Sequence, residues 1–120
     1  EMKLINAMSR EHTMRRCLAD LKKNYDYIII DCMPSLGMIT VNALASADRV
    51  IIPVQAHYLA LKGMGNLLST ISSVRKDLNP DLQVGGVLLT LVDNRTNLAK
   101  EIKEELVANY GNLVKIFPSI

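Results

Sequence analysis

The sequence predicts an α/β fold with a mainly parallel sheet flanked by helices. Short apolar runs alternate along the chain with longer segments whose apolar residues recur every three or four positions. The runs are continuous, which is typical of strands buried on both faces. Strands that alternate with helices form parallel sheets with right-handed crossovers. With 120 residues, 49% of them hydrophobic, the chain is long and apolar enough for one domain.

The first half of the chain is expected to form two helices and two strands. Met14, Cys17 and Leu18 recur at helical spacing, which predicts a helix over 13–23. The run over 27–32 is continuous and β-branched, which predicts a strand buried on both faces. The next expected elements are a loop over 34–37, a short helix over 40–47 and a second buried strand over 49–54.

The second half continues the alternation. A long helix is expected over 61–78 because Leu67, Ile71 and Val74 recur on one side, and Pro80 follows its end. The remaining expected elements are a third apolar strand over 83–91, a polar loop over 93–97, an amphipathic helix over 98–110 that ends at Gly111, and a fourth strand over 114–117.

Composition argues against several classes of protein. No apolar run approaches the roughly 20 residues that cross a bilayer, and residues 1–10 show no signal peptide. The net charge of +2 does not by itself indicate a nucleic-acid partner. The small aromatic share, 4%, argues against a base-stacking surface. Cys17 and Cys32 match no zinc spacing, and two free thiols without a signal fit a reducing cytoplasm.

Polar residues mark the ends of three expected strands, at Asp31, at Gln55 and at 90–95. Parallel sheets carry their chemistry at the carboxyl ends of the strands. A buried carboxylate without a partner is very costly, so Asp31 must reach water, a partner or a metal. The polar residues at any one strand end could belong to an ordinary solvated loop. Polar residues at three strand ends along one sheet edge indicate a functional site.

These strand ends lie within ordered sequence blocks. The chain reads YDYIIIDCMPSLG over 25–37, TVNAL over 40–44, IIPVQ over 51–55 and GVLLTLVDNRTNLAKEI over 86–102. In this order the blocks resemble the ParA/Soj branch of the ParA/MinD partition ATPases. These are P-loop NTPases with a deviant Walker A motif. The resemblance extends over nearly the whole chain and implies a partial doubly wound, mainly parallel sheet of the P-loop NTPase type, flanked by helices.

The resemblance implies roles for the first strand end and the loop after it. Asp31 matches the Walker B aspartate, which helps to hold magnesium through water beside the nucleotide phosphates. The alternative is a strand-end carboxylate that caps a loop amide. Pro34, Ser35, Leu36 and Gly37 match the loop that senses the γ-phosphate, although an ordinary strand-to-helix turn would also need the glycine. The sequence departs from the family at Met33, where the family has proline.

The resemblance also implies roles for the third strand end. Thr90, Asp93 and Asn94 match the loop that approaches the nucleotide base. Arg95 matches a family arginine implicated in sequence-independent DNA binding, and the alternative is an arginine of a solvated loop. Of the residues after the second strand, Gln55 is expected to line the site or the dimer face. His57 is expected to be a surface residue, because no second ligand stands at metal spacing.

No segment of the chain resembles the phosphate cradle Lys-Gly-Gly-x-Gly-Lys-Thr. The family has this motif and its catalytic aspartate upstream of the matching part, and it continues beyond the matching part. We therefore expect 1–120 to be the central fragment of a single P-loop ATPase-like domain, either truncated or from a degenerate gene product. The full-length protein is expected to hydrolyse ATP with magnesium, whereas the isolated chain is expected to be inactive and to bind no ATP tightly.

The function implied by the resemblance is the partition of plasmid, chromosomal or mobile-element DNA. Family members form ATP-dependent homodimers, bind DNA non-specifically, respond to a DNA-bound ParB-type partner, and are cytoplasmic and nucleoid-associated. Two alternatives stay open. One is a non-catalytic interaction module that retains half of the fold. The other is a MinD-like positioning ATPase, which would need an amphipathic membrane helix that this chain does not contain.

Overall fold

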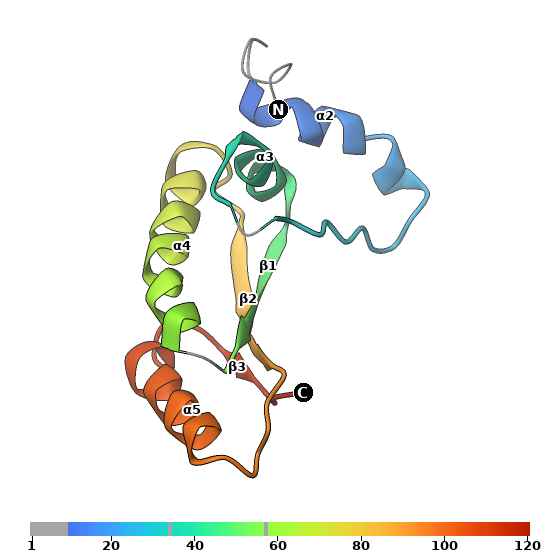
Figure 1. The fold of residues 1–120 in the computed structure, drawn as a ribbon. Coiled ribbons are helices and arrows are strands. Elements are labelled where there is room, and N and C mark those ends of the chain that lie inside the picture. Colours follow the sequence, from blue (N-terminus) through green and yellow to red (C-terminus); the bar gives the residue numbers. More distant parts are fainter. Residues whose placement is uncertain (1–9, 34, 57) are drawn as a thin grey trace. The chain divides into compact units, whose positions relative to one another are not determined.

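Three parallel strands form one sheet in the order β1–β2–β3 (Figure 1). β1 spans Arg49–Gln55, β2 spans Gln83–Thr90 and β3 spans Ile116–Phe117. β1 and β2 pair in parallel from Arg49 opposite Gln83 to Gln55 opposite Thr90. The predicted parallel α/β fold is therefore confirmed, and the fourth expected strand is present in shortened form.

This computed structural model describes residues 10–33, 35–56 and 58–120. The chain divides into two units, each with its own buried residues. The first unit consists of residues 1–48 and 69–82, and the second of residues 49–68 and 83–120.

The second unit buries one face of the sheet. Ile52 and Val54 of β1 and Val87 and Leu89 of β2 are all buried, whereas Ile51 is exposed. The strand alternation therefore separates a core face from an open face. Helix α5, Asn97–Tyr110, adds its own buried residues, which recur at helical spacing: Ala99, Ile102 and Leu106. The predicted amphipathic helix is confirmed.

β2 carries a bulge that only glycine can occupy. Gly86 has a φ of 149°, and the register between β1 and β2 shifts between Val50 and Ile51. A Cβ atom on Gly86 would lie 2.6 Å from the Lys115 carbonyl oxygen and 2.7 Å from Cε2 of Phe117. The missing side chain thus lets the Lys115–Phe117 segment pair closely with β2.

The first unit contains short helical segments and one end of a long helix. Its described elements are η1 (Arg10–His12), α2 (Thr13–Leu18), η2 (Leu21–Lys23), α3 (Met38–Ser46) and the last part of α4 (Tyr58–Asp77). The single helix predicted over 13–23 is wrong, because the chain breaks after Leu18 and continues as a 3-10 turn. None of the residues of α2 is buried, so packing provides little support for a longer helix.

Two buried asparagines connect the elements of the first unit. Oδ1 of Asn42 accepts a hydrogen bond from the Met14 amide at 3.1 Å, and Nδ2 donates to the Met38 carbonyl at 3.0 Å. Nδ2 of Asn79 donates to two carbonyl oxygens at the end of α3, those of Leu44 and Ala47. Both side chains are buried with their hydrogen-bonding capacity in use, as buried amides require.

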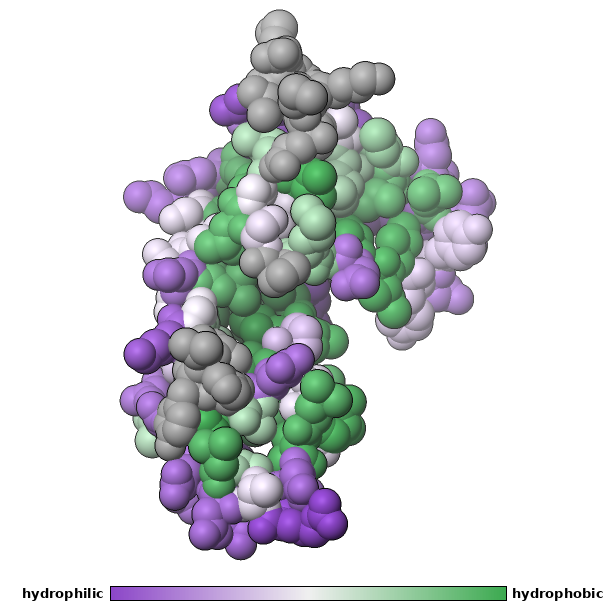
Figure 2. All heavy atoms as spheres, viewed as in Figure 1, coloured by the Kyte–Doolittle hydropathy of each residue, from purple (hydrophilic) through white to green (hydrophobic). Residues whose placement is uncertain are grey.

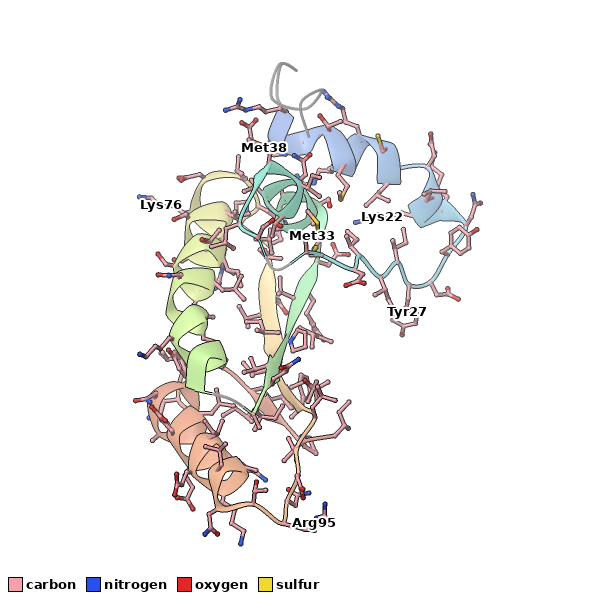
Figure 3. The ribbon with its side chains drawn as sticks, viewed as in Figure 1. Lys22, Tyr27, Met33, Met38, Lys76 and Arg95 are labelled. Atoms are coloured by element: carbon pink, nitrogen blue, oxygen red, sulfur yellow. The ribbon has the colours of Figure 1, made fainter. Side chains whose placement is uncertain are left out.

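The strand predicted over 27–32 does not form. Tyr27 is 87% exposed and Ile29 is 92% exposed, and no described residue pairs with this segment as a strand. A β-strand needs a neighbour for its backbone hydrogen bonds, and a run of apolar residues cannot supply one by itself. Figure 3 shows the Tyr27 side chain projecting away from the ribbon, and Figure 2 shows hydrophobic residues at the surface of the face in view. The prediction of a strand buried on both faces is therefore wrong for this structure.

Candidate functional site

The loop after β2 leaves the sheet through an unusual backbone conformation. Leu91 has a φ of 54°, a left-handed conformation that residues with bulky side chains rarely adopt. Just before it, Oγ1 of Thr90 lies 3.5 Å from the Val54 carbonyl oxygen of β1. The left-handed residue turns the chain away from the sheet, so that the polar residues that follow reach the surface.

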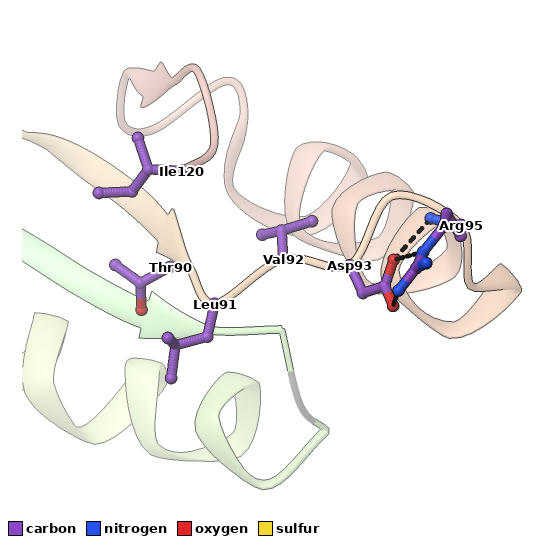
Figure 4. Close-up of a pocket in the computed structure, with 6 residues that line it drawn as sticks. All are labelled: Thr90, Leu91, Val92, Asp93, Arg95 and Ile120. Atoms are coloured by element: carbon purple, nitrogen blue, oxygen red, sulfur yellow. Dashed lines mark hydrogen bonds and ion pairs between the residues drawn. The ribbon is translucent and has the colours of Figure 1, made fainter.

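A shallow pocket of about 670 Å³ lies at this strand end (Figure 4). It is lined by Thr90, Leu91, Val92, Asp93, Arg95 and Ile120. Ile120 is held beside β2, because its amide donates to the Leu89 carbonyl at 3.0 Å and its carbonyl accepts from the Val92 amide at 3.3 Å. The pocket thus combines apolar walls with one carboxylate and one guanidinium.

Asp93 and Arg95 form a two-pronged ion pair inside this loop. Nε of Arg95 donates to Oδ1 of Asp93 at 2.9 Å and Nη2 donates to Oδ2 at 3.0 Å. The Arg95 amide also donates to Oδ1, at 3.0 Å. These bonds lower the pKa of the Asp93 carboxyl and raise the pKa of Arg95, so both groups stay charged at neutral pH. Figure 4 shows the two side chains directed at each other.

The same loop is fixed to the start of α5. The Asp93 carbonyl oxygen accepts from the Thr96 amide at 3.1 Å and from the Thr96 hydroxyl at 2.9 Å. Oγ1 of Thr96 in turn accepts from the Ala99 amide at 3.3 Å and caps the helix. Loop geometry therefore depends on main-chain and hydroxyl bonds as well as on the ion pair.

Asn94, the other residue that was expected to approach the nucleotide base from this loop, is exposed and does not line the pocket.

The second candidate set lies in the first unit, around Asp31. Its side chain is exposed and forms no hydrogen bond or ion pair with any described residue, so the carboxylate is accessible to a cation. The Cys32 thiol after it lies 3.8 Å from the Ile30 carbonyl oxygen. Partial burial raises the pKa of Cys32, and the negative charge of Asp31 raises it further. Within the described ranges no group of three acidic, histidine or cysteine side chains could hold a metal ion.

The loop between Asp31 and α3 is fixed by a residue that the sequence analysis did not select. Pro34 lies outside the described residues, and Ser35 and Leu36 are exposed. The buried Thr40 hydroxyl donates to the Ser35 carbonyl oxygen. Gly37 precedes α3 in an extended conformation, and its carbonyl oxygen accepts from the Val41 amide at 3.1 Å. The signal for Thr40 was its place in the block TVNAL, directly after the loop.

The predicted site residues therefore belong to different units. Asp31, Ser35, Leu36 and Gly37 are in the first unit, whereas Thr90, Asp93, Asn94 and Arg95 are in the second. Gln55 lies opposite Thr90 in the sheet register and is exposed, and His57 lies outside the described residues. None of the helices in the described ranges is long and apolar enough to cross a membrane.

Sequence comparison identifies a family and several close relatives. A family model described as an AAA domain matches residues 1–84. The sporulation initiation inhibitor protein Soj of Bacillus subtilis is 53% identical over 88% of this chain and 42% of its own length. The chromosome partitioning protein ParA of Myxococcus xanthus is 51% identical over 88% of this chain and 38% of its own. The chain thus spans less than half the length of either relative.

Solved structures give the same fold. A Mycobacterium smegmatis protein described as cobyrinic acid a,c-diamide synthase, with bound ADP and magnesium, superposes with a TM-score of 0.86. It is 42% identical, over 92% of this chain and 45% of its own. A plasmid partition protein from Borrelia burgdorferi superposes with a TM-score of 0.76 and is 28% identical, over 96% of this chain and 46% of its own.

Proposed function

Because this chain belongs to the ParA/Soj family of AAA-domain partition ATPases, we propose that it is the central part of an ATPase that partitions DNA. The DNA is chromosomal, plasmid or mobile-element DNA, and the protein acts by ATP-dependent dimerisation and non-specific DNA binding. The observation that carries this proposal is the identity of 53% to Soj and 51% to ParA over most of the chain. The Mycobacterium smegmatis protein that is described as a cobyrinic acid a,c-diamide synthase is less similar, at 42% identity, so its name carries less weight for this proposal.

In this proposal ATP and magnesium bind to the complete gene product. Asp31 holds magnesium through water, and its exposed carboxylate without a described partner supports that role. The bound ion would neutralise charge on the phosphates during transfer to water. Ser35, Leu36 and Gly37, with Pro34, sense the γ-phosphate, and the Thr40 hydroxyl positions this loop through the Ser35 carbonyl oxygen. The named contents of the synthase structure, ADP and magnesium, support this cofactor pair.

The loop after β2 has two roles in the proposal. Thr90, Asp93 and Asn94 approach the nucleotide base, and the pocket that Thr90 and Asp93 help to line supports this role. Arg95 binds the phosphate backbone of DNA, and the 90% exposure of its side chain supports that role. The complete protein acts in the cytoplasm on the nucleoid as a homodimer, with a DNA-bound ParB-type protein as its partner.

The proposal is tested by magnesium-dependent ATP hydrolysis of the complete gene product with duplex DNA present. Asp31→Asn is expected to reduce the rate by about tenfold or more, the usual effect of losing a residue that holds a metal through water. Asp26→Asn is the matched control, because this exposed carboxylate lies on the same segment and forms no bond with a described residue. Full activity of Asp31→Asn, or equal loss in both variants, contradicts the assignment.

The exposed apolar segment supports a second candidate function, a non-catalytic interaction module. Tyr27, Ile29 and Met33 are all largely exposed, as expected for a surface that another chain covers. Calorimetry of the complete gene product with Mg-ATP separates the two functions. Micromolar ATP binding supports the ATPase, and its absence in a folded protein supports the module.

A further inference from the structure

The ion pair in the loop after β2 leaves three of the five N–H groups of the Arg95 guanidinium available. A guanidinium carries five N–H groups, and the bonds to Asp93 use one on Nε and one on Nη2. The Arg95 side chain is 90% exposed, whereas that of Asp93 is 48% exposed. The remaining three N–H groups can therefore meet an incoming phosphate while the carboxylate stays bound (Figure 4).

We propose that Asp93 attenuates the contact between Arg95 and the phosphates of DNA, so that the Asp93–Arg95 pair sets the strength of non-specific DNA binding. This inference rests on the proposed DNA-binding role of Arg95. An approaching phosphate meets a neutral pair instead of a free cation, so the attenuation depends on the presence of Arg95. An exposed pair of this kind is weak, so it lowers DNA affinity without abolishing binding.

The geometry favours attenuation over a purely structural role for the carboxylate charge. The Thr96 amide and hydroxyl bind the main-chain carbonyl of Asp93, and these bonds need no charge. The Arg95 amide binds one side-chain oxygen, Oδ1, which an asparagine also provides. Asp93→Asn is therefore expected to preserve the loop while it removes the negative charge beside the guanidinium.

The test is a double-mutant cycle in the complete gene product, with saturating Mg-ATP and two unrelated DNA duplexes at several salt concentrations. The four proteins are wild type, Asp93→Asn, Arg95→Ala and the double variant. Asp93→Asn is expected to bind both duplexes about two- to fivefold more tightly at ~0.1 M salt and to steepen the salt slope by up to about one unit per loop. In the Arg95→Ala background the same change is expected to have no effect.

A matched control separates the pair from net charge. Glu104→Gln removes one exposed carboxylate from α5, in the same unit as the loop. It is expected to change DNA affinity less than Asp93→Asn. An equal gain in Glu104→Gln, or a gain from Asp93→Asn that persists without Arg95, would show a general charge effect and overturn the inference. Weaker binding by Asp93→Asn would mean that the carboxylate orients Arg95, which also overturns it.

Two further outcomes separate this inference from the proposed function. If Arg95→Ala binds DNA as wild type does, the proposed role of Arg95 fails, and the inference fails with it. If Arg95→Ala weakens binding but Asp93→Asn leaves it unchanged, only the inference fails. If Asp93→Asn raises the affinity for Mg-ATP by the same factor as the affinity for DNA, the phosphate that Arg95 contacts belongs to the nucleotide, and the inference is overturned. Thermal unfolding of each variant verifies that the loop change leaves the fold intact.

Discussion

The side-chain nitrogen of Asn79, Nδ2, caps the end of helix α3 by donating a hydrogen bond to the Ala47 carbonyl oxygen, 2.8 Å away. The same nitrogen donates to the Leu44 carbonyl at 3.0 Å, and Oδ1 lies 3.4 Å from Nη2 of Arg15. These carbonyls belong to the last turn of the helix and the residue after it, where intrahelical partners are missing. Asn79 is 1% exposed, so water cannot replace its bonds without opening the unit.

Asn79→Ala is expected to lower the free energy of unfolding of the complete gene product by about 1–3 kcal/mol, because it leaves buried carbonyl oxygens without donors. Urea denaturation measures this change. Asn94→Ala is the control, since that side chain is exposed and no bond to a described residue is lost. Equal stability of the Asn79 and Asn94 variants would contradict the proposed capping role.

The glycine at the β2 bulge gives a second prediction about stability. Gly86→Ala is expected to cost about 2–4 kcal/mol, because a Cβ at a φ of 149° would be strained and would overlap the Lys115 carbonyl. Gly63→Ala is the matched control, because the residue lies within α4 and a Cβ there would meet no atom within 4 Å apart from its chain neighbours and the adjacent helix backbone. We expect Gly63→Ala to be neutral or to stabilise by up to about 1 kcal/mol. Thermal denaturation of both variants tests the difference.

The Thr40 hydroxyl gives a prediction about nucleotide discrimination. Thr40→Val removes the donor to the Ser35 carbonyl oxygen and keeps the branched shape, so the loop proposed to sense the γ-phosphate loses a restraint. We expect the preference of the complete gene product for ATP over ADP to fall by about fivefold, the equivalent of one neutral hydrogen bond. Thr40→Ser, which keeps a hydroxyl, is expected to restore it. Equal loss in Thr40→Ser would indicate a packing effect instead.

The sequence predicted most of the elements because their patterns are local. The continuous run before Gln55 and the three-and-four spacing in 98–110 each identify an element without knowledge of the rest of the chain. Residues 27–32 carry an equally strong local pattern, and the prediction there is wrong because strand pairing is not local. No pattern in the sequence states which neighbour a strand has.

The candidate site was predictable to a similar degree. Polar residues at strand ends selected the loop that contains Asp93 and Arg95, and the structure places both beside one pocket. Their mutual ion pair was not predicted, because residues two apart face each other only when the backbone turns, as it does after Leu91. Thr40 was missed for the same reason, since its partner is a main-chain carbonyl five residues earlier.

The exposed segment before Pro34 leads to the last prediction, which concerns the 120-residue chain by itself. Tyr27 is 87% exposed and Ile29 is 92% exposed, and the extended backbone between them pairs with no described strand. An apolar segment with unpaired backbone groups readily adds to the edge of another chain. Light scattering is therefore expected to show dimers or larger species that increase with concentration.

Ile29→Lys is expected to shift this chain towards the monomer, because a charged side chain on an open strand opposes edge pairing. Leu113→Lys is the matched control, since Leu113 is 73% exposed but lies in the second unit. If association proceeds through the segment 27–30, only the Ile29 variant dissociates. A wild-type monomer at high concentration would contradict the prediction, and equal dissociation of both variants would assign association to general surface hydrophobicity, because the two substitutions add the same charge to different units.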